Sequence, residues 1–258
     1  MSLGNFTTNI CSSNWDLGNK RKVQLETIKI ILSCFFLSGS LLSQQYSISI
    51  FGLHAADVNL IRDSTGTEFK TNNRGLFDLI WPTSNMYRTS FDREDLSIKS
   101  WDKTIKQGSY ETTLSGGLNS DGHMEYKDKE IVKIKSGTHT IFTMIELVSK
   151  RDKDFLDTKW FHYEHEGSLG RARFIWADSS NQWNGQDSIF CDHYRFDIDI
   201  IDSTQYIRTN DYFMDTIINP SCIRELWVSK TDPKRIILAK ISIKGIPVLA
   251  RIQIDKET

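Results

Sequence analysis

The sequence has little of several things, and each shortage excludes a class of protein. Four cysteines in 258 residues are too few for a scaffold built on disulfides. With 32 basic and 33 acidic residues, the formal net charge of -1 gives no positive field to hold a nucleic acid backbone. Four prolines and 15 glycines exclude collagen-like and proline-rich chains. We therefore expect a folded protein that does not bind nucleic acid.

Recognisable catalytic and cofactor-binding motifs are missing as well. The chain has no G-x-x-x-x-G-K-[ST] phosphate loop and no G-x-G-x-x-G dinucleotide fingerprint. It also lacks the G-x-S-x-G turn that presents a nucleophilic serine in many hydrolases. We therefore expect no cofactor and no enzymatic activity.

A short apolar run near the N-terminus is typical of a Sec signal peptide. Basic residues at 20–22 and 29 precede the 13-residue uncharged run Ile30–Leu42, and Ser43 is a small residue where cleavage fits. A membrane span needs about 20 apolar residues, so export is favoured over an uncleaved anchor or a buried helix. We divide the chain into a leader plus signal peptide, 1–44, and a single β-rich domain, 45–258. The expected location is the periplasm or cell envelope, with membrane contact only through the signal segment.

Removal of residues 1–44 changes the charge and the cysteine count of the mature chain. Four basic and two acidic residues leave with the leader, so 28 basic and 31 acidic residues remain, a net charge of -3. Two cysteines remain, Cys191 and Cys222. In an oxidising compartment they could form a disulfide. The alternative is two separate buried thiols that pack as small apolar side chains.

Period-two alternation of apolar and polar residues predicts antiparallel strands through most of the mature chain. The clearest strand is Asp192–Ile201, and residues 237–243 and 248–254 form two more around a predicted hairpin at 244–247. Loops are expected at Ser115–Gly122 and Asp178–Asp187. About a dozen strands would form a large curved antiparallel sheet, or a partial or closed barrel, because such a sheet must dispose of its edges.

One segment has a helical period instead. Ile141, Met144, Ile145 and Val148 recur at spacings of three and four residues, behind an N-cap candidate at Thr138 or Thr140. An amphipathic stripe of this kind needs an apolar surface to cover. We expect one helix of about three turns, packed on the sheet.

The order of these motifs resembles the bacterial domain-of-unknown-function 3108 family of exported proteins. Tyr46–Leu53 is similar to the family's first strand, although Ala56 stands where a second glycine is usual. The stretch 81–92, the helix at 138–150 with Trp160–Gly167, and the ending from Leu226 through Gly245 resemble later family segments. The resemblance implies a curved antiparallel sheet or partial barrel outside the cytoplasm. It implies no catalytic residues.

The densest group of metal-ligand residue types is the segment 162–166, His-Tyr-Glu-His-Glu. On a strand, His162, Glu164 and Glu166 share one face and His165 lies on the other. A zinc site would need further ligands, and Cys191 and His193 are the candidates. The competing interpretation, which we favour, is a solvated polar face beside buried aromatic residues. A metal-assisted hydrolase that uses His162, His165 and His193 therefore remains an alternative.

Aromatic residues make up 11% of the chain. They suit the core of a large β domain, and they also suit the wall of a ligand-binding concavity. The tryptophans to examine for a binding role are Trp81, Trp101, Trp176 and Trp183.

These observations favour a non-enzymatic, exported envelope protein that binds or carries a hydrophobic or glycan ligand. Its partners would be a lipid, a glycan or an envelope protein. A purely structural role in envelope assembly, with sheet edges that pair to a partner strand, is a further alternative.

Overall fold

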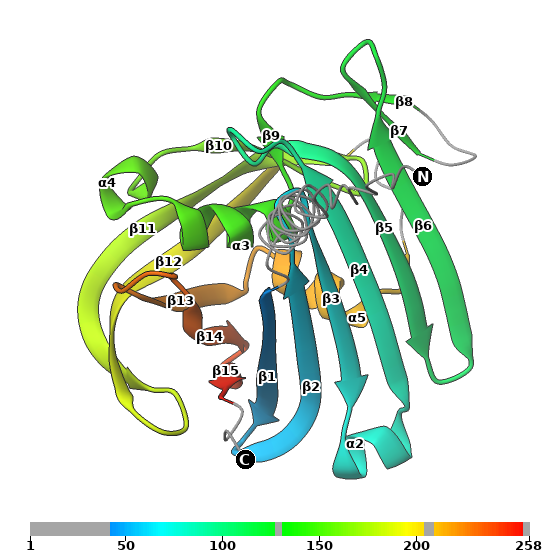
Figure 1. The fold of residues 1–258 in the computed structure, drawn as a ribbon. Coiled ribbons are helices and arrows are strands. Elements are labelled where there is room, and N and C mark those ends of the chain that lie inside the picture. Colours follow the sequence, from blue (N-terminus) through cyan, green and yellow to red (C-terminus); the bar gives the residue numbers. More distant parts are fainter. Residues whose placement is uncertain (1–41, 127–130, 204–208, 255–258) are drawn as a thin grey trace, which may run out of the picture. The chain divides into compact units, whose positions relative to one another are not determined.

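The computed structural model describes residues 42–126, 131–203 and 209–254, which form one sheet with four helices (Figure 1). The predicted signal segment, 1–44, lies outside the described residues except for its last three positions. The strands are β1 (Leu42–Ile50), β2 (Leu53–Arg62), β3 (Gly66–Asn73), β4 (Thr83–Phe91), β5 (Ile98–Gln107), β6 (Tyr110–Leu118), β7 (His123–Tyr126), β8 (Ile131–Lys133), β9 (Thr138–His139), β10 (Phe161–His165), β11 (Ser168–Trp183), β12 (Ser188–Asp202), β13 (Ile223–Ser229), β14 (Ile236–Ile243) and β15 (Ile246–Gln253). The helices are α2 (Gly75–Ile80), α3 (Ile141–Lys150), α4 (Lys153–Leu156) and α5 (Tyr212–Ile218).

The 15 strands follow the order β8-β7-β6-β5-β4-β3-β2-β1-β15-β14-β13-β12-β11-β10-β9. All neighbours are antiparallel except β9 and β10. The sheet curves strongly, as Figure 1 shows, but β8 and β9 are its two edges and do not pair with each other in the described part of the chain. The predicted mainly-β fold with a large curved sheet is therefore confirmed, and the sheet is open rather than a closed barrel.

Alternation along the strands places one face of the sheet against the core. In β12, Tyr194 and Phe196 are buried on the inner face, as the pattern of Asp192–Ile201 predicts. The hairpin predicted at 244–247 is also present, because β14 and β15 pair from Ile243 and Ile246 outward. A strand with a period of two buries one set of side chains and exposes the other, so local sequence was sufficient here.

Helix α3 lies against the inner face of the sheet, as its period predicts. The Thr140 side chain caps its N-terminus by accepting a hydrogen bond from the Thr143 backbone N–H, while the Thr143 hydroxyl accepts one from the Thr140 N–H. Glu146 is fully buried and forms an ion pair with the buried Arg62 of β2. The helix is thus fastened to the sheet by a charge pair as well as by its apolar face.

Two predicted loops are wrong in part. Residues 115–118 belong to β6 and residues 178–183 belong to β11, so the connections are shorter than expected. Gly116, which falls in the loop predicted at 115–122, lies within strand β6, where an added Cβ would be 3.3 Å from the Trp101 ring and 3.2 Å from the Met124 sulfur. The glycine therefore allows a tryptophan to pack closely on the sheet.

The core has two parts. The larger cluster joins the inner face of β1, β2, β4 and β10–β15 to α3 and α5. The smaller cluster joins Ile98 and Trp101 of β5 to buried residues of β6–β8. The described residues, 42–126, 131–203 and 209–254, belong to one compact unit. Among the residues described, no helix is long and apolar enough to span a membrane.

Candidate functional site

An apolar cavity of about 160 Å³ lies between the inner face of the sheet and helices α3 and α5. The strands β1, β2 and β13–β15 supply most of its wall, and β3, β11 and β12 add phenylalanine rings. Its lining residues are Tyr46, Ile48, Val58, Leu60, Phe69, Ile141, Phe142, Ile145, Phe174, Phe196, Phe213, Met214, Ile217, Arg224, Glu225, Leu226, Ile236, Ala239, Lys240, Ile241, Val248 and Ala250. We call it the inner cavity.

Small side chains on one wall leave this space open. Ala239 of β14 and Ala250 of β15 are directly opposite each other in the sheet and both line the inner cavity. Two methyl groups stand there while Phe174, Phe196 and Phe213 form other parts of the wall. Protein interiors are otherwise packed nearly as densely as organic crystals, so a void of this size is a specific feature of the fold.

A second hollow, of about 590 Å³, lies at one end of the sheet and adjoins the inner cavity. Both hollows are lined by Ile48, Phe213, Ile241 and Val248. Its remaining lining is mostly apolar and includes Phe77, Trp81 and Tyr212, together with a few polar side chains such as Asn85 and Gln107. We call it the outer hollow.

Helix α5 stands between the two hollows. Met214 and Ile217 line the inner cavity, Tyr212 and Thr216 line the outer hollow, and Phe213 lines both. Helix α5 therefore forms part of the partition between the two spaces, together with the strand residues that line both.

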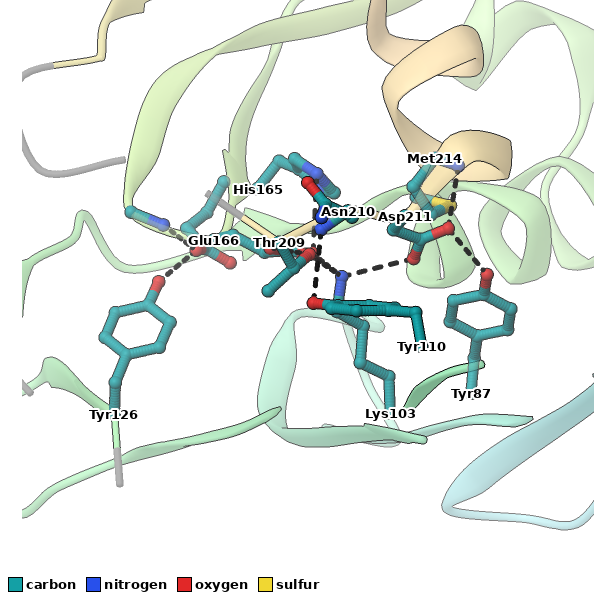
Figure 2. Close-up of polar contacts among 12 residues, drawn as sticks. Tyr87, Lys103, Tyr110, Tyr126, His165, Glu166, Thr209, Asn210, Asp211 and Met214 are labelled. Atoms are coloured by element: carbon teal, nitrogen blue, oxygen red, sulfur yellow. Dashed lines mark hydrogen bonds and ion pairs between the residues drawn. The ribbon is translucent and has the colours of Figure 1, made fainter. Parts of the chain in front are cut away.

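A buried polar cluster holds the N-terminus of α5 (Figure 2). The Asp211 carboxylate accepts a hydrogen bond from the Met214 backbone N–H at 3.2 Å, which caps the helix. The same carboxylate accepts the Tyr87 hydroxyl of β4 at 3.0 Å and pairs with the Lys103 ammonium of β5 at 3.1 Å. Burial raises the pKa of Tyr87 well above its ordinary value, so this hydroxyl stays a donor.

Lys103 also binds the turn between β10 and β11. Its ammonium pairs with the Glu166 carboxylate and donates to the Thr209 hydroxyl at 2.7 Å, and that hydroxyl donates to Glu166 at 3.0 Å. All three side chains are buried. With Asp211 the cluster has two carboxylates for one lysine. Burial raises the pKa of Glu166, although the nearby positive charge of Lys103 acts in the opposite direction.

Glu164 occupies an adjacent and still drier position. It is fully buried, and its carboxyl accepts hydrogen bonds from the Tyr126 hydroxyl of β7 and from the Gly167 backbone N–H at 2.9 Å. Burial raises the pKa of Glu164 to about 7. Burial, with the Lys103 charge nearby, lowers the pKa of His165 to about 3, so this histidine is neutral at physiological pH.

The C-terminus of α5 is held by Arg224 of β13. Its guanidinium is buried and donates hydrogen bonds to the backbone oxygens of Ile217 and Asn219 and, at 3.5 Å, of Phe196. Cations are stabilised at this end of a helix because the last carbonyl groups are unpaired and carry partial negative charge. Helix α5 is thus fastened at both ends by buried charge.

The polar cluster has little room for a substrate. The space beside Lys103, Glu164 and Glu166 is about 30 Å³, which is roughly the volume that one water molecule occupies. The arrangement can hold charge and position α5, whereas the adjoining inner cavity offers about 160 Å³.

The four tryptophans singled out from the sequence are not brought together. Trp81 borders the outer hollow, half exposed, with its ring 6.1 Å from that of Tyr212. Trp101 is buried against Tyr126. Trp176 donates to Asp192 on the neighbouring strand, and Trp183 is exposed at the end of β11. Trp81 is the one of these four that lies at the outer hollow.

The structure does not assemble the three histidines into a metal site. His162 is exposed on β10, His165 is buried on the same strand, and His193 of β12 stacks on Trp227 with ring centroids 4.2 Å apart. Within the described ranges, no three or more His, Cys, Asp or Glu residues are grouped to hold a metal. The interpretation of 162–166 as a solvated face is also wrong, because Glu164, His165 and Glu166 are all buried.

Cys191 and Cys222 are separate buried thiols, so the disulfide alternative is wrong. Cys191 is paired in register with Ser229 at the far end of β13, whereas Cys222 precedes the first residue of that strand. Seven residues of extended strand separate the two positions by roughly 20 Å, and a disulfide needs Cα atoms within about 7 Å. Burial raises the pKa of Cys191 to about 12.

Sequence reasoning did not identify Lys103, Asp211 or Arg224. They are joined to partners by the fold and form no local motif; Lys103 and Asp211 are 108 residues apart. One signal was present. Lys103 shares a strand face with Trp101 and Ile105, and a lysine on an otherwise apolar face needs a buried partner.

No family model matches the chain, and no curated protein matches it. Among solved structures, a beta-barrel-like protein of domain of unknown function DUF1849 from Brucella abortus is similar, with a TM-score of 0.49 and 9% sequence identity. The match covers 84% of this chain and 98% of that one.

Proposed function

We propose that the protein is a non-enzymatic carrier in the periplasm or cell envelope that encloses the hydrocarbon part of an apolar ligand. The observation that carries this proposal is the inner cavity, with its almost wholly apolar lining. Apolar cavities of about 150 Å³ stay dry and take up molecules such as benzene. A longer hydrocarbon would extend from the inner cavity into the outer hollow. The predicted signal peptide supports the location.

The chemistry of the walls favours a lipid over a glycan. A sugar needs many hydrogen-bond partners when it leaves water, because each unpaired polar group costs free energy. Phenylalanine, isoleucine, valine and alanine side chains dominate the inner cavity. Its charged lining residues already have partners, because the Arg224 guanidinium donates to backbone carbonyl oxygens and Glu225 pairs with Lys240 at 2.8 Å.

The test is to fill the inner cavity. Ala239→Phe and Ala250→Phe each place a ring in it, whereas Ala177→Phe adds the same ring on the exposed part of β11. A neutral naphthylamine dye, whose fluorescence rises in apolar surroundings, is titrated into the full chain. We expect the two filling variants to weaken dye binding by about tenfold or more, which is about 1.4 kcal/mol, and the control to leave it unchanged.

Near-ultraviolet circular dichroism checks that each variant keeps its tertiary packing, because overfilling a core costs about 1–3 kcal/mol. Solvent extraction of the purified protein, followed by mass spectrometry, is an independent measurement in which a co-purified lipid is expected. The proposal fails if the parent chain binds no dye, or if correctly folded filling variants bind it as well as the parent does.

A further inference from the structure

Large apolar side chains are exposed together at the end of the sheet where the outer hollow lies. They are Phe51 and Leu53 at the β1–β2 turn, Leu76, Leu79 and Ile80 in α2, and Trp81 directly after it. Leu79 is 81% exposed and Ile80 is 77% exposed. We call these six residues the apolar rim. Contiguous exposure of such side chains is uncommon in soluble monomers and marks an interaction surface.

Strand pairing brings the two segments of the rim together. Ile50 and Leu53 pair across the β1–β2 turn, and Ala56 of β2 pairs with Asn73, just before α2. The Arg74 backbone N–H donates to the Ala55 carbonyl at 2.8 Å. Figure 1 shows α2 and the start of β2 at the lower end of the sheet.

Packing against the sheet does not account for the apolar residues of α2. All six of its residues, Gly-Leu-Phe-Asp-Leu-Ile, are described, and none of them is buried. A helix of this length is held by tertiary packing or by a partner, because short helices are marginal in water. Phe77 lines the outer hollow, whereas Leu76, Leu79 and Ile80 are left uncovered by the described chain.

The apolar rim is continuous with the outer hollow. This continuity limits the kind of partner that can cover the rim. Trp81 belongs to both, and Phe77 of α2 and Tyr212 of α5 line the outer hollow beside it. A rigid protein partner seated on the rim would cover the entrance to a lipid site. A bilayer surface would instead place the entrance against acyl chains, so that a ligand could pass without crossing water.

The polar groups near the rim fit a neutral surface rather than a charged one. Arg74 is paired with Asp57, while Asp78 and Lys244 are exposed charges of opposite sign. Trp81 and Tyr212 supply amphipathic rings, of the kind that lie at membrane interfaces. Attraction to such a surface would come from apolar burial and would be nearly independent of salt.

We propose that the apolar rim docks on a lipid bilayer, so that the outer hollow opens toward the acyl chains from which the ligand enters. The proposal rests on the proposed carrier function and names the source of the ligand.

Flotation of the full chain with phosphatidylcholine vesicles tests this proposal. Every protein carries Phe35→Asp and Phe36→Asp, because the apolar run at 30–42 would otherwise bind vesicles by itself. The rim variant adds Leu79→Glu and Ile80→Glu. The control adds Trp183→Glu and Phe190→Glu, two exposed apolar residues of the β11–β12 hairpin, which lies at the opposite end of the sheet.

We expect the parent and the control to float with vesicles at low and at high salt, and the rim variant to lose at least about fivefold of the bound fraction. Dye binding without vesicles is expected to be equal in all three proteins. Failure of the parent to float, or equal losses in the control and rim variants, would overturn the docking proposal. If flotation behaves as expected but no protein binds dye, the carrier function fails while the docking surface stands.

Discussion

At the residue scale, Glu164 shows how burial changes the protonation of a carboxyl group. A strand normally has one buried and one exposed face. In β10 both faces are covered from Tyr163 onward, because Tyr163 packs in the larger core while Glu164 meets Tyr126 of the smaller one. The carboxyl therefore has no solvated side, and its charged form is disfavoured.

This environment makes stability depend on pH in a defined direction. A glutamate has an unfolded pKa near 4.5, and burial raises the folded pKa of Glu164 to about 7. The folded chain therefore holds a proton that the unfolded chain releases between these values. The stability contributed by neutral Glu164 is complete below pH 4.5 and is lost as pH rises through about 7. The loss is on the order of 3 kcal/mol.

The measurement is urea unfolding of the parent and Glu164→Gln at pH 5 and pH 8. Glutamine keeps the acceptor oxygen for Tyr126 and Gly167. Burial lowers the pKa values of His139 to about 4 and of His165 to about 3, so these residues destabilise the fold as pH falls below 6.5. The contribution of these two histidines is the same in the parent and in Glu164→Gln, so it cancels when the two proteins are compared. We expect the variant to gain stability relative to the parent as pH rises. A difference that is constant with pH would refute the prediction.

The sequence alone was sufficient to predict burial and helix capping where the periodicity of a single strand or helix determines them. Tyr194 and Phe196 follow from alternation within β12, and Thr140 follows from its place before a helical stripe. The burial of Glu164 does not follow from its strand, because it depends on β5 and β7, which approach from distant parts of the sequence.

At the element scale, α5 is held more by its ends than by its apolar face. Two of its seven residues, Met214 and Ile217, are buried. Asp211 caps the first turn and Arg224 binds the last carbonyl groups. The helix would therefore loosen when either charged group is removed, and it stands between the inner cavity and the outer hollow.

Replacement of Arg224 by methionine tests this account. The variant keeps an unbranched side chain but leaves the carbonyl groups of Ile217 and Asn219 without their donor. We expect amide hydrogen exchange in α5 to speed up by roughly tenfold, because local opening becomes easier. Arg195→Met is the control, since Arg195 is an exposed residue of β12 that pairs with Asp197. Unchanged exchange in α5 of the Arg224 variant would contradict the account.

Element prediction succeeded where periodicity was strong and failed where glycine and polar residues suggested turns. Helix α3 and the β14–β15 hairpin lie where their patterns place them. Residues 178–183 have the polar composition of a loop, yet they pair in β11 with residues of β12 as far as Ser188. Backbone pairing overrides side-chain preference there, because both strands extend beyond the core.

At the scale of the whole molecule, side chains join parts of the sheet that backbone pairing leaves apart. Lys103 lies on β5, toward the β8 edge, and Glu166 follows β10, toward the β9 edge. Tyr126 and Glu164 make a second link between the same two arms. The open sheet is thus fastened by buried polar contacts where a closed barrel would have a backbone ladder.

Breaking this fastening should lower global stability. Lys103→Met leaves two buried carboxylates without their cation, and we expect a loss of about 3–5 kcal/mol in the free energy of unfolding. Lys106→Met is the control on the same strand, because its pair with Glu111 is exposed and such pairs contribute about 0–1 kcal/mol.

Adding Glu166→Gln to Lys103→Met removes one of the stranded charges. We expect the double variant to recover part of the loss in urea unfolding, since the two residues interact directly. Losses that simply add, or a control as unstable as Lys103→Met, would show that the pair does not fasten the sheet.

The short edges of the open sheet have a consequence for self-association. A long unpaired strand is a template for polymerisation, because its free N–H and C=O groups can add a strand from another copy. The outermost described strands are three residues of β8 and two of β9, and Lys133 and Lys135 are exposed at the β8 edge. Longer strands extend past these short ones, because in the described part of the chain β7 pairs with residues 116–118 of β6 and β10 pairs with residues 168–172 of β11. Short strands flanked by lysine are among the ways in which natural sheets resist aggregation. The outermost strands therefore offer few free backbone groups to another copy, and the uncovered segments of β6 and β11 are where strand addition would find more of them.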